Sequence, residues 1–252
     1  MKPMLAALAL TVATALPAFA FDPANMSDAE KEAFGTAIRE YLMANPEVLV
    51  ESINVLEARR VAQEVENDAL LVVNNRDAIF EDGHSWVGGN PDGDITMVEF
   101  VDYKCGYCKK VNPEVEALIK SDGNIRFILK EFPILGQESD IAARFAVSVQ
   151  QIAGPEAYKK AHDALMTLNG PVNLESLTKL AQEQGLDSQA VINRMNTEDV
   201  SAVLRKNHQL AESMAIMGTP TFIIGPEMLR GVPASGLANA VEAARKSQAE
   251  QG

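Results

Sequence analysis

The fold of this chain is decided by residues 95–108, which have the sequence ITMVEFVDYKCGYC. The first seven residues are mostly apolar, as in a buried strand. Cys105 and Cys108 are the two cysteines of the chain and follow where this strand runs into a helix. Two thiols at this spacing in the first turn of a helix indicate disulfide exchange, in which one sulfur attacks and the other resolves the mixed disulfide.

The position of each cysteine predicts its role. A sulfur at a helix N-terminus faces unpaired backbone N–H groups and the positive end of the helix dipole, which favour a thiolate. We therefore expect Cys105 to be the exposed attacking thiolate and Cys108 to be the more shielded resolving thiol. A zinc site is disfavoured, because no histidine stands at a ligand spacing. An inert structural disulfide would close a loop too small to stabilise the fold much.

The rest of the chain predicts an α/β fold around this stretch. A strand, a helix and a second strand in succession favour a parallel pair joined by a right-handed crossover. A long helical region at about residues 140–212 then interrupts the sheet, and a helix follows from about residue 235. Four strands are predicted, at residues 95–101, 125–130, 221–224 and 228–230.

Glu99 is an acid within an otherwise apolar strand, six residues before Cys105. Burying a carboxylate without a partner is costly, so its presence calls for an explanation. One hypothesis is that Glu99 accepts and returns the proton of Cys108. The alternative is that Glu99 faces solvent on an edge strand. Lys130, in the adjacent predicted strand, is a candidate partner for Glu99, and the alternative is that it lies at the surface, as lysines more commonly do.

The N-terminal residues have the features of a secretory signal. A short apolar run from Met4 to Leu16 is followed by Ala-Phe-Ala and a polar segment, which predicts cleavage after Ala20. An uncleaved membrane anchor is the weaker alternative, because the run is shorter than a membrane-spanning helix requires. Export would place the thiols where disulfides persist. The net charge of −13 argues against a nucleic-acid partner.

Residues 21–82 are expected to form a helical region that a glycine-rich loop separates from a domain at residues 83–252. Ser27 is a plausible N-cap and Asn45-Pro46 marks a break, with Asn45 a possible cap of the next helix. These helices either pack onto their own domain or form an oligomerisation stalk. The apolar positions expected to make such contacts are Phe34, Ile38, Leu42, Leu49, Ile53 and Leu56.

A second motif, Gly218-Thr219-Pro220, precedes the late apolar strand. Together with the Cys-Gly-Tyr-Cys site and the acid six residues before it, this motif resembles the thioredoxin fold. The export signal, the helical insertion and the segment KEFPILG at residues 130–136 resemble the bacterial DsbA-type thiol:disulfide oxidoreductases, and within them the ScsC and Com1-like group. The resemblance implies that Pro220 is cis and that Thr219, with Tyr107 nearby, contacts an extended substrate.

The function expected from these features is thiol:disulfide exchange on exported, cysteine-containing proteins in the periplasm. The Gly-Tyr and Thr-Pro dipeptides resemble those of DsbC-type isomerases, which favours isomerase or reductase activity. The alternatives are a DsbA-type oxidase and a copper-binding thiol protein. We expect no cofactor and no metal site. The expected partners are a membrane redox protein that recycles the cysteines and further copies of this chain, as a dimer or trimer.

Overall fold

The structure of the protein is a computed structural model that describes residues 25–251. The predicted signal sequence and its cleavage after Ala20 lie outside the described residues. The described residues divide into two units, with the boundary between Arg59 and Arg60. None of the described helices combines the length and apolar character needed to cross a membrane.

The described part of the first unit is helical. Helix α1 (Asp28–Ala44) begins at Ser27, whose side chain and that of Glu30 form the reciprocal hydrogen bonds of a capping box, as the sequence predicts. The side chain of Asn45 donates to the carbonyl of Tyr41 at 2.8 Å, so Asn45 caps the end of α1. The next helix, α2 (Glu47–Asn74), begins two residues later. No residue of α1 is buried.

The second unit begins within α2 and contains the sheet. Val72 of α2 and Ile79 of the short helix α3 (Arg76–Phe80) are buried in its core. Within the predicted helical region, α2 ends at Asn74, and the side chain of Asn75 donates to the carbonyl of Leu71 before α3 begins. Residues 60–82 therefore belong to the same compact unit as the cysteines, ahead of the boundary that the sequence analysis placed at residue 83.

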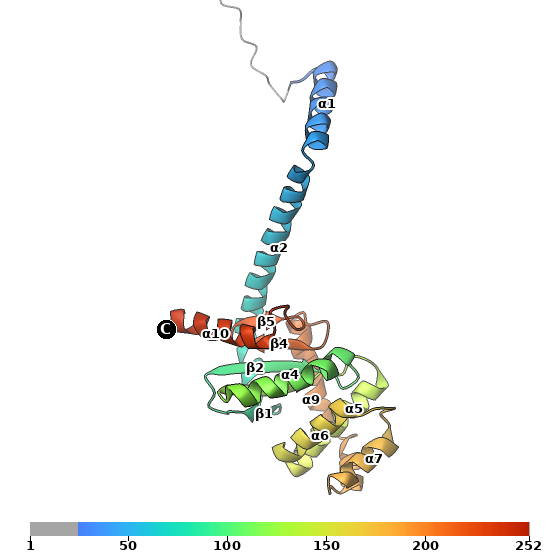
Figure 1. The fold of residues 1–252 in the computed structure, drawn as a ribbon. Coiled ribbons are helices and arrows are strands. Elements are labelled where there is room, and N and C mark those ends of the chain that lie inside the picture. The colour runs from blue at the N-terminus through green and yellow to red at the C-terminus, as the bar shows by residue number, and fades with distance from the viewer. Residues whose placement is uncertain (1–24, 252) are drawn as a thin grey trace, which may run out of the picture. The chain divides into compact units, whose positions relative to one another are not determined.

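Five strands form one mixed sheet in the order β1-β3-β2-β4-β5 (Figure 1). The parallel pairing of β2 with β3 is confirmed, and the other three pairings are antiparallel. The expected number of four strands was wrong, because the edge strand β1 was taken for a loop. The strands are β1 (Trp86–Gly89), β2 (Ile95–Val101), β3 (Ile125–Glu131), β4 (Thr221–Ile224) and β5 (Glu227–Leu229).

Seven further helices complete the unit (Figure 1). Five of them form the expected helical insertion between β3 and β4, and α5, α6 and α7 pack together there. The first of the seven carries the cysteines and continues through Pro113. Their bounds are α4 (Gly106–Asp122), α5 (Gln137–Ala153), α6 (Pro155–Thr167), α7 (Leu174–Glu183), α8 (Ser188–Arg194), α9 (Glu198–Ser213) and α10 (Leu237–Gln251).

Apolar side chains are buried on both faces of the sheet. One face packs with α4, α6 and α10 and includes Met97, Val101 and Leu129. The opposite face includes Val98, Phe100 and Ile128, and packs with α3, α9 and the end of α2. Alternate residues of β2 thus enter different cores, which is why this strand is apolar on both faces apart from Thr96 and Glu99.

Candidate active site

The turn between β2 and α4 is held by a buried carboxylate. Asp102, with 1% of its surface exposed, accepts the backbone N–H of Lys104 at 2.7 Å and the hydroxyl of Ser139 at 2.8 Å. Its second oxygen accepts the N–H groups of Ile134 and Leu135. Asp102 therefore ties the turn before the cysteines to the loop after β3. Sequence reasoning missed this role, although an acid directly after a buried strand was its signal.

The two thiols lie at the start of α4, as expected. Cys105 is the N-cap residue, and its Sγ accepts the backbone N–H of Cys108 at 3.5 Å. The same thiol donates to the carbonyl of Thr219 at 3.2 Å. Cys105 is 6% exposed and Cys108 is fully buried. Cys105 is thus the more accessible of the two, but it is less exposed than expected.

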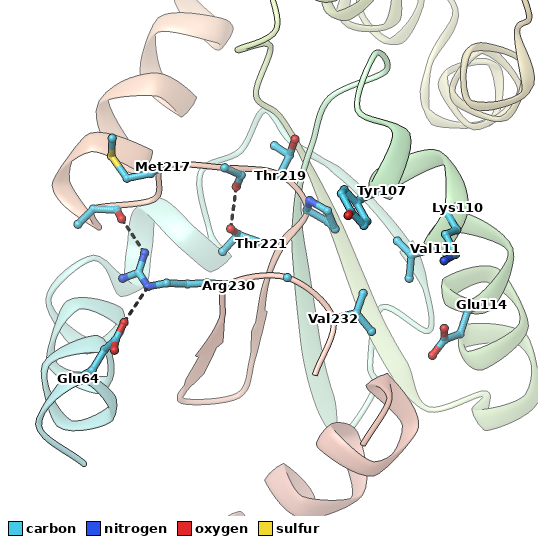
Figure 2. Close-up of a pocket in the computed structure, with 14 residues that line it drawn as sticks. Glu64, Tyr107, Lys110, Val111, Glu114, Met217, Thr219, Thr221, Arg230 and Val232 are labelled. Carbon is cyan, nitrogen blue, oxygen red and sulfur yellow. Dashed lines mark hydrogen bonds and ion pairs between the residues drawn. The ribbon is translucent and has the colours of Figure 1, made fainter. Parts of the chain in front are cut away.

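The loop before β4 lies directly against Cys105. The Thr219–Pro220 peptide bond is cis, as the resemblance implies. The hydroxyl of Thr221 donates to the carbonyl of Gly218 at 2.8 Å and closes the turn (Figure 2). The carbonyl of Thr219 therefore lies beside the sulfur of Cys105. An exposed backbone edge of this kind is where an extended peptide can add by main-chain hydrogen bonds.

A cleft of about 920 Å³ opens beside this loop. Figure 2 shows Tyr107 and Lys110 of α4 on one side of it, and Thr221 and Arg230 on the other. Tyr107 is 75% exposed and Met217 is 88% exposed, so both present apolar surface at the cleft. Large exposed apolar side chains gathered at a cleft are typical of a binding site.

Glu99 lies on the central strand and is 1% exposed, so the alternative of a solvent-facing edge position was wrong. Burial, with smaller contributions from Glu116, Cys105 and Glu131, raises the pKa of Glu99 to about 8. Burial also raises the pKa of Cys108 far above its ordinary value, and Glu99 contributes to that shift. The carboxyl and the buried thiol are therefore electrostatic neighbours, which the proton-transfer hypothesis requires.

Lys130 is not the partner of Glu99, so that expectation was wrong. In the register of the sheet Glu99 lies opposite Leu129, and side chains alternate between faces, so Lys130 faces the other core. There its ammonium group contacts the carboxylate of Asp82 and the carbonyl of Ala78, which ties α3 to the sheet.

Another buried acid, Glu131, shares the face of Glu99 and was missed by the sequence analysis. One oxygen of Glu131 accepts the hydroxyl of Tyr103 at 2.7 Å and that of Tyr158 at 2.6 Å. Burial nevertheless raises the pKa of Glu131 to about 8. His162 lies beside this pair, with its Nδ1 3.2 Å from the Tyr103 hydroxyl. Burial lowers the pKa of His162 to about 3, so this histidine is neutral.

One group of possible metal ligands occurs among residues 25–251. It consists of Glu116, His162 and Asp163. The ammonium group of Lys159 already lies 3.1 Å from Glu116 and 2.6 Å from Asp163. A lysine that pairs with both carboxylates supplies the positive charge that a metal ion would bring, so this group carries no metal proposal.

Comparisons with known proteins agree with this geometry. Residues 96–242 match the family model of the DSBA-like thioredoxin domain, and residues 30–63 match that of the copper resistance protein ScsC N-terminal domain. A thioredoxin-like oxidoreductase from Silicibacter pomeroyi is 40% identical, with 68% of this chain and 98% of that chain covered and a TM-score of 0.63.

Two further relatives extend the comparison. Proteus mirabilis ScsC in a transitional conformation is 26% identical, with 92% of this chain and 100% of that chain covered and a TM-score of 0.62. The Na⁺/H⁺ antiporter NhaA 1 of Salinispora arenicola is 26% identical over 55% of this chain, but the chain spans only 21% of that protein. Since one family model alone covers more than half of the sequence, the chain belongs to the family of proteins with a DsbA-like thioredoxin domain, and within it lies close to ScsC.

Proposed function

We propose that this protein is a thiol:disulfide oxidoreductase that acts on exported proteins in the periplasm, as an isomerase or reductase. The observation that carries the proposal is the position of Cys105. Its sulfur caps α4 and lies 3.2 Å from the carbonyl of Thr219, a residue of the loop that lines the cleft. A client cysteine bound along that loop would meet the attacking sulfur directly.

The first step is attack by the Cys105 thiolate on a client disulfide. A bond forms between Cys105 Sγ and one client sulfur, and the other client sulfur leaves as a thiolate. The Cys108 thiol then loses its proton to Glu99 and attacks Cys105, which releases the reduced client and leaves a Cys105–Cys108 disulfide. A pKa of about 8 suits Glu99 to this exchange of a proton near neutral pH.

An isomerase uses the same first step with a different ending. A second client thiol attacks the mixed disulfide, a new client disulfide forms, and Cys105 leaves as the thiolate. The enzyme is then not oxidised. In the reductase reaction a membrane redox partner would have to return two electrons to the cysteine pair. An oxidase of the DsbA type would run the two steps in reverse.

The roles of the two sulfurs are tested by trapping. We expect Cys108→Ser to accumulate a mixed disulfide with a disulfide-containing client, because the resolving thiol is absent. Cys105→Ser should form none, since Cys108 is fully buried. The products are counted by mass spectrometry after acid quenching. Trapping through Cys108 would reverse the assignment, and failure of both variants and of the wild type to react would refute the proposed exchange.

The direction of the reaction is tested in the cell. Thiols are alkylated immediately after acid quenching of the exporting bacterium, and the cysteine pair is then examined by gel shift. A pair that is mostly reduced supports the isomerase or reductase, whereas a pair that is mostly oxidised supports the DsbA-type oxidase.

We further propose that the protein is a homo-oligomer assembled through residues 25–59. The match to the ScsC N-terminal domain, at residues 30–63, covers most of this region. Five of the six apolar residues expected to make contacts are 44–65% exposed in the single chain, and Leu42 is half-buried. An apolar set of this size on two helices is costly to leave in water, so a second or third copy of the same helices is the proposed occupant.

Copper binding is a second candidate, because one matching family model is named for copper resistance. Cys105 Sγ accepts the backbone N–H of Cys108 at 3.5 Å, and the two thiols of this turn are soft ligands that suit Cu(I). Competition of the reduced protein against a Cu(I) chelator tests this. Equal copper affinity in the wild type and in Cys105→Ser would exclude the cysteine pair as the site.

A further inference from the structure

Arg230 follows β5 and reaches the loop that carries Thr219 and Pro220. Its Nη1 donates to the carbonyl of Ala215 at 2.6 Å, and Figure 2 shows the guanidinium group at the edge of the cleft. The loop from Ala215 to Pro220 supplies much of one wall of that cleft. The side chain of Arg230, from the segment after β5, thus holds the start of the loop from Ala215 to Pro220, and the end of this loop lies against Cys105.

The backbone at Ala215 needs such support. Its φ of +50° lies in the left-handed region, which residues other than glycine rarely adopt. The flanking side chains of Met214 and Ile216 are buried in the core, whereas Met217 is 88% exposed at the cleft. The chain therefore turns sharply outward at Ala215, and the hydrogen bond from Arg230 is made to the residue at which it turns.

The other side of the guanidinium group binds α2. Nη2 donates to the carboxylate of Asp68 at 2.7 Å, and Nε lies 3.9 Å from the carboxylate of Glu64. Asp68 is only 8% exposed, so this pair is partly shielded from water. The planar guanidinium can serve two acceptors in different directions, which the single ammonium group of a lysine does not reproduce.

We infer that Arg230 is a positioning residue for the client-binding loop, and that it acts by joining Ala215 to Asp68. This inference rests on the proposed function, because it requires that the cleft receive a client segment. The hydrogen bonds and ion pairs of Arg230 are made with Ala215, Asp68 and Glu64, and none involves a cysteine. It is expected to set how tightly a peptide docks rather than how fast the sulfurs react.

The test compares Arg230→Lys with a matched control, Arg245→Lys, in the full-length protein. Arg245 also bridges two acids, Asp94 and Asp122, but lies outside the cleft. The probe is a quenched fluorescent peptide with one internal disulfide, and oxidised glutathione serves as a small substrate. For Arg230→Lys we expect KM for the peptide to rise about tenfold, the effect of losing one hydrogen bond to a charged donor.

In Arg230→Lys we expect kcat for the peptide and the rate with oxidised glutathione to change by less than about threefold, because the substitution leaves the reacting sulfurs in place. Asp68→Asn should give a smaller rise in KM. Arg245→Lys should leave KM at the wild-type value. Equal values of KM for Arg230→Lys and Arg245→Lys would overturn the inference, as would losses of kcat and of the glutathione rate that match the change in KM.

Hydrogen exchange gives a second readout that does not depend on catalysis. The amides of Ile216 to Thr219 should exchange faster in Arg230→Lys than in the wild type, while those of β2 keep their protection. Unchanged exchange in the loop would refute the inference even if the variant lost activity. If the wild type fails to act on the peptide, the proposed function fails, whereas the exchange experiment still decides whether Arg230 holds the loop.

Discussion

Glu99 stands out in the sequence as an acid in an apolar strand, but its chemistry depends on its surroundings in the fold. An acid between Val98 and Phe100 breaks the apolar pattern of the strand, and the sequence alone left open whether it was buried. The structure places it on the central strand, 1% exposed and on the same face as the helix with the cysteines. Its pKa of about 8 follows mainly from that burial.

The raised pKa of Glu99 predicts a pH-dependent stability difference between the wild type and Glu99→Gln. Between the ordinary value of 4.5 and about 8, the folded protein keeps a proton that the unfolded chain releases. Glu99 therefore makes stability fall as pH rises, by at most about 1.4 kcal/mol per pH unit, and Glu99→Gln removes this contribution while that of Glu131 remains.

Urea unfolding of both proteins at about pH 5 and about pH 8 measures the difference. We expect Glu99→Gln to gain stability relative to the wild type at the higher pH. Glu114→Gln, which changes an exposed acid, serves as the control and should follow the wild type. Parallel stability curves for Glu99→Gln and the wild type would show that Glu99 does not keep its proton on folding.

The proposed role of Glu99 in proton transfer predicts a separate kinetic effect. Glu99→Gln should slow the resolution of the mixed disulfide by Cys108, by about tenfold or more, because an amide does not accept the thiol proton. Formation of the mixed disulfide by Cys105 should change much less. Stopped-flow mixing with a chromophoric disulfide separates the two steps, and equal slowing of both would leave Glu99 a structural residue.

At the level of elements, the sequence predicted the order of the main strands and helices because each carries its own pattern. It failed at β1, a strand of four residues that contains two glycines. Gly88 is not there to form a loop: a Cβ at that position would lie 1.9 Å from the indole of Trp86, which folds across it. The glycines of β1 suggested a loop, whereas Gly88 is needed in the strand because it leaves room for the indole of Trp86.

The same strand predicts a large loss of stability on removal of its tryptophan. Trp86 is 7% exposed, stacks on Tyr158 at 5.7 Å and donates its indole N–H to the carbonyl of Pro155 at 3.0 Å. We expect Trp86→Ala to reduce the free energy of unfolding by about 3–5 kcal/mol. Val87→Ala, on the other face of the strand, should cost less than about 1 kcal/mol.

Urea denaturation followed by circular dichroism compares these variants. Equal midpoints for Trp86→Ala and Val87→Ala would show that the contact between β1 and α6 contributes little to stability. The indole joins two elements that are far apart in the sequence, so local sequence patterns do not predict its contribution to stability.

At the scale of the whole chain, sequence patterns located the redox site but not the start of the compact unit that carries it. The cysteines, the glycine-threonine-proline motif and the two central strands have local signals. The attachment of residues 60–82 depends instead on long-range contacts, such as Lys130 with Asp82 and Arg230 with Asp68. A helix that looks uniform in sequence therefore contributes to two units.

This division predicts the outcome of two truncations. A variant that begins at Arg60 keeps the buried residues Val72 and Ile79 and should be a folded monomer that still exchanges disulfides. A variant that begins at Gly83 removes them from the core and should lose several kcal/mol of stability. We expect the full-length protein to be a dimer or trimer by multi-angle light scattering.

Assembly should matter for isomerisation more than for simple exchange. An isomerase must hold a misfolded client while wrong disulfides are rearranged, and several active sites on one particle raise the effective concentration of thiols around it. The variant that begins at Arg60 should therefore reduce insulin at the rate of the full-length protein per active site, but regain less activity from scrambled ribonuclease. A monomeric full-length protein would refute assembly through residues 25–59, and a truncated monomer with full isomerase activity would separate assembly from isomerisation.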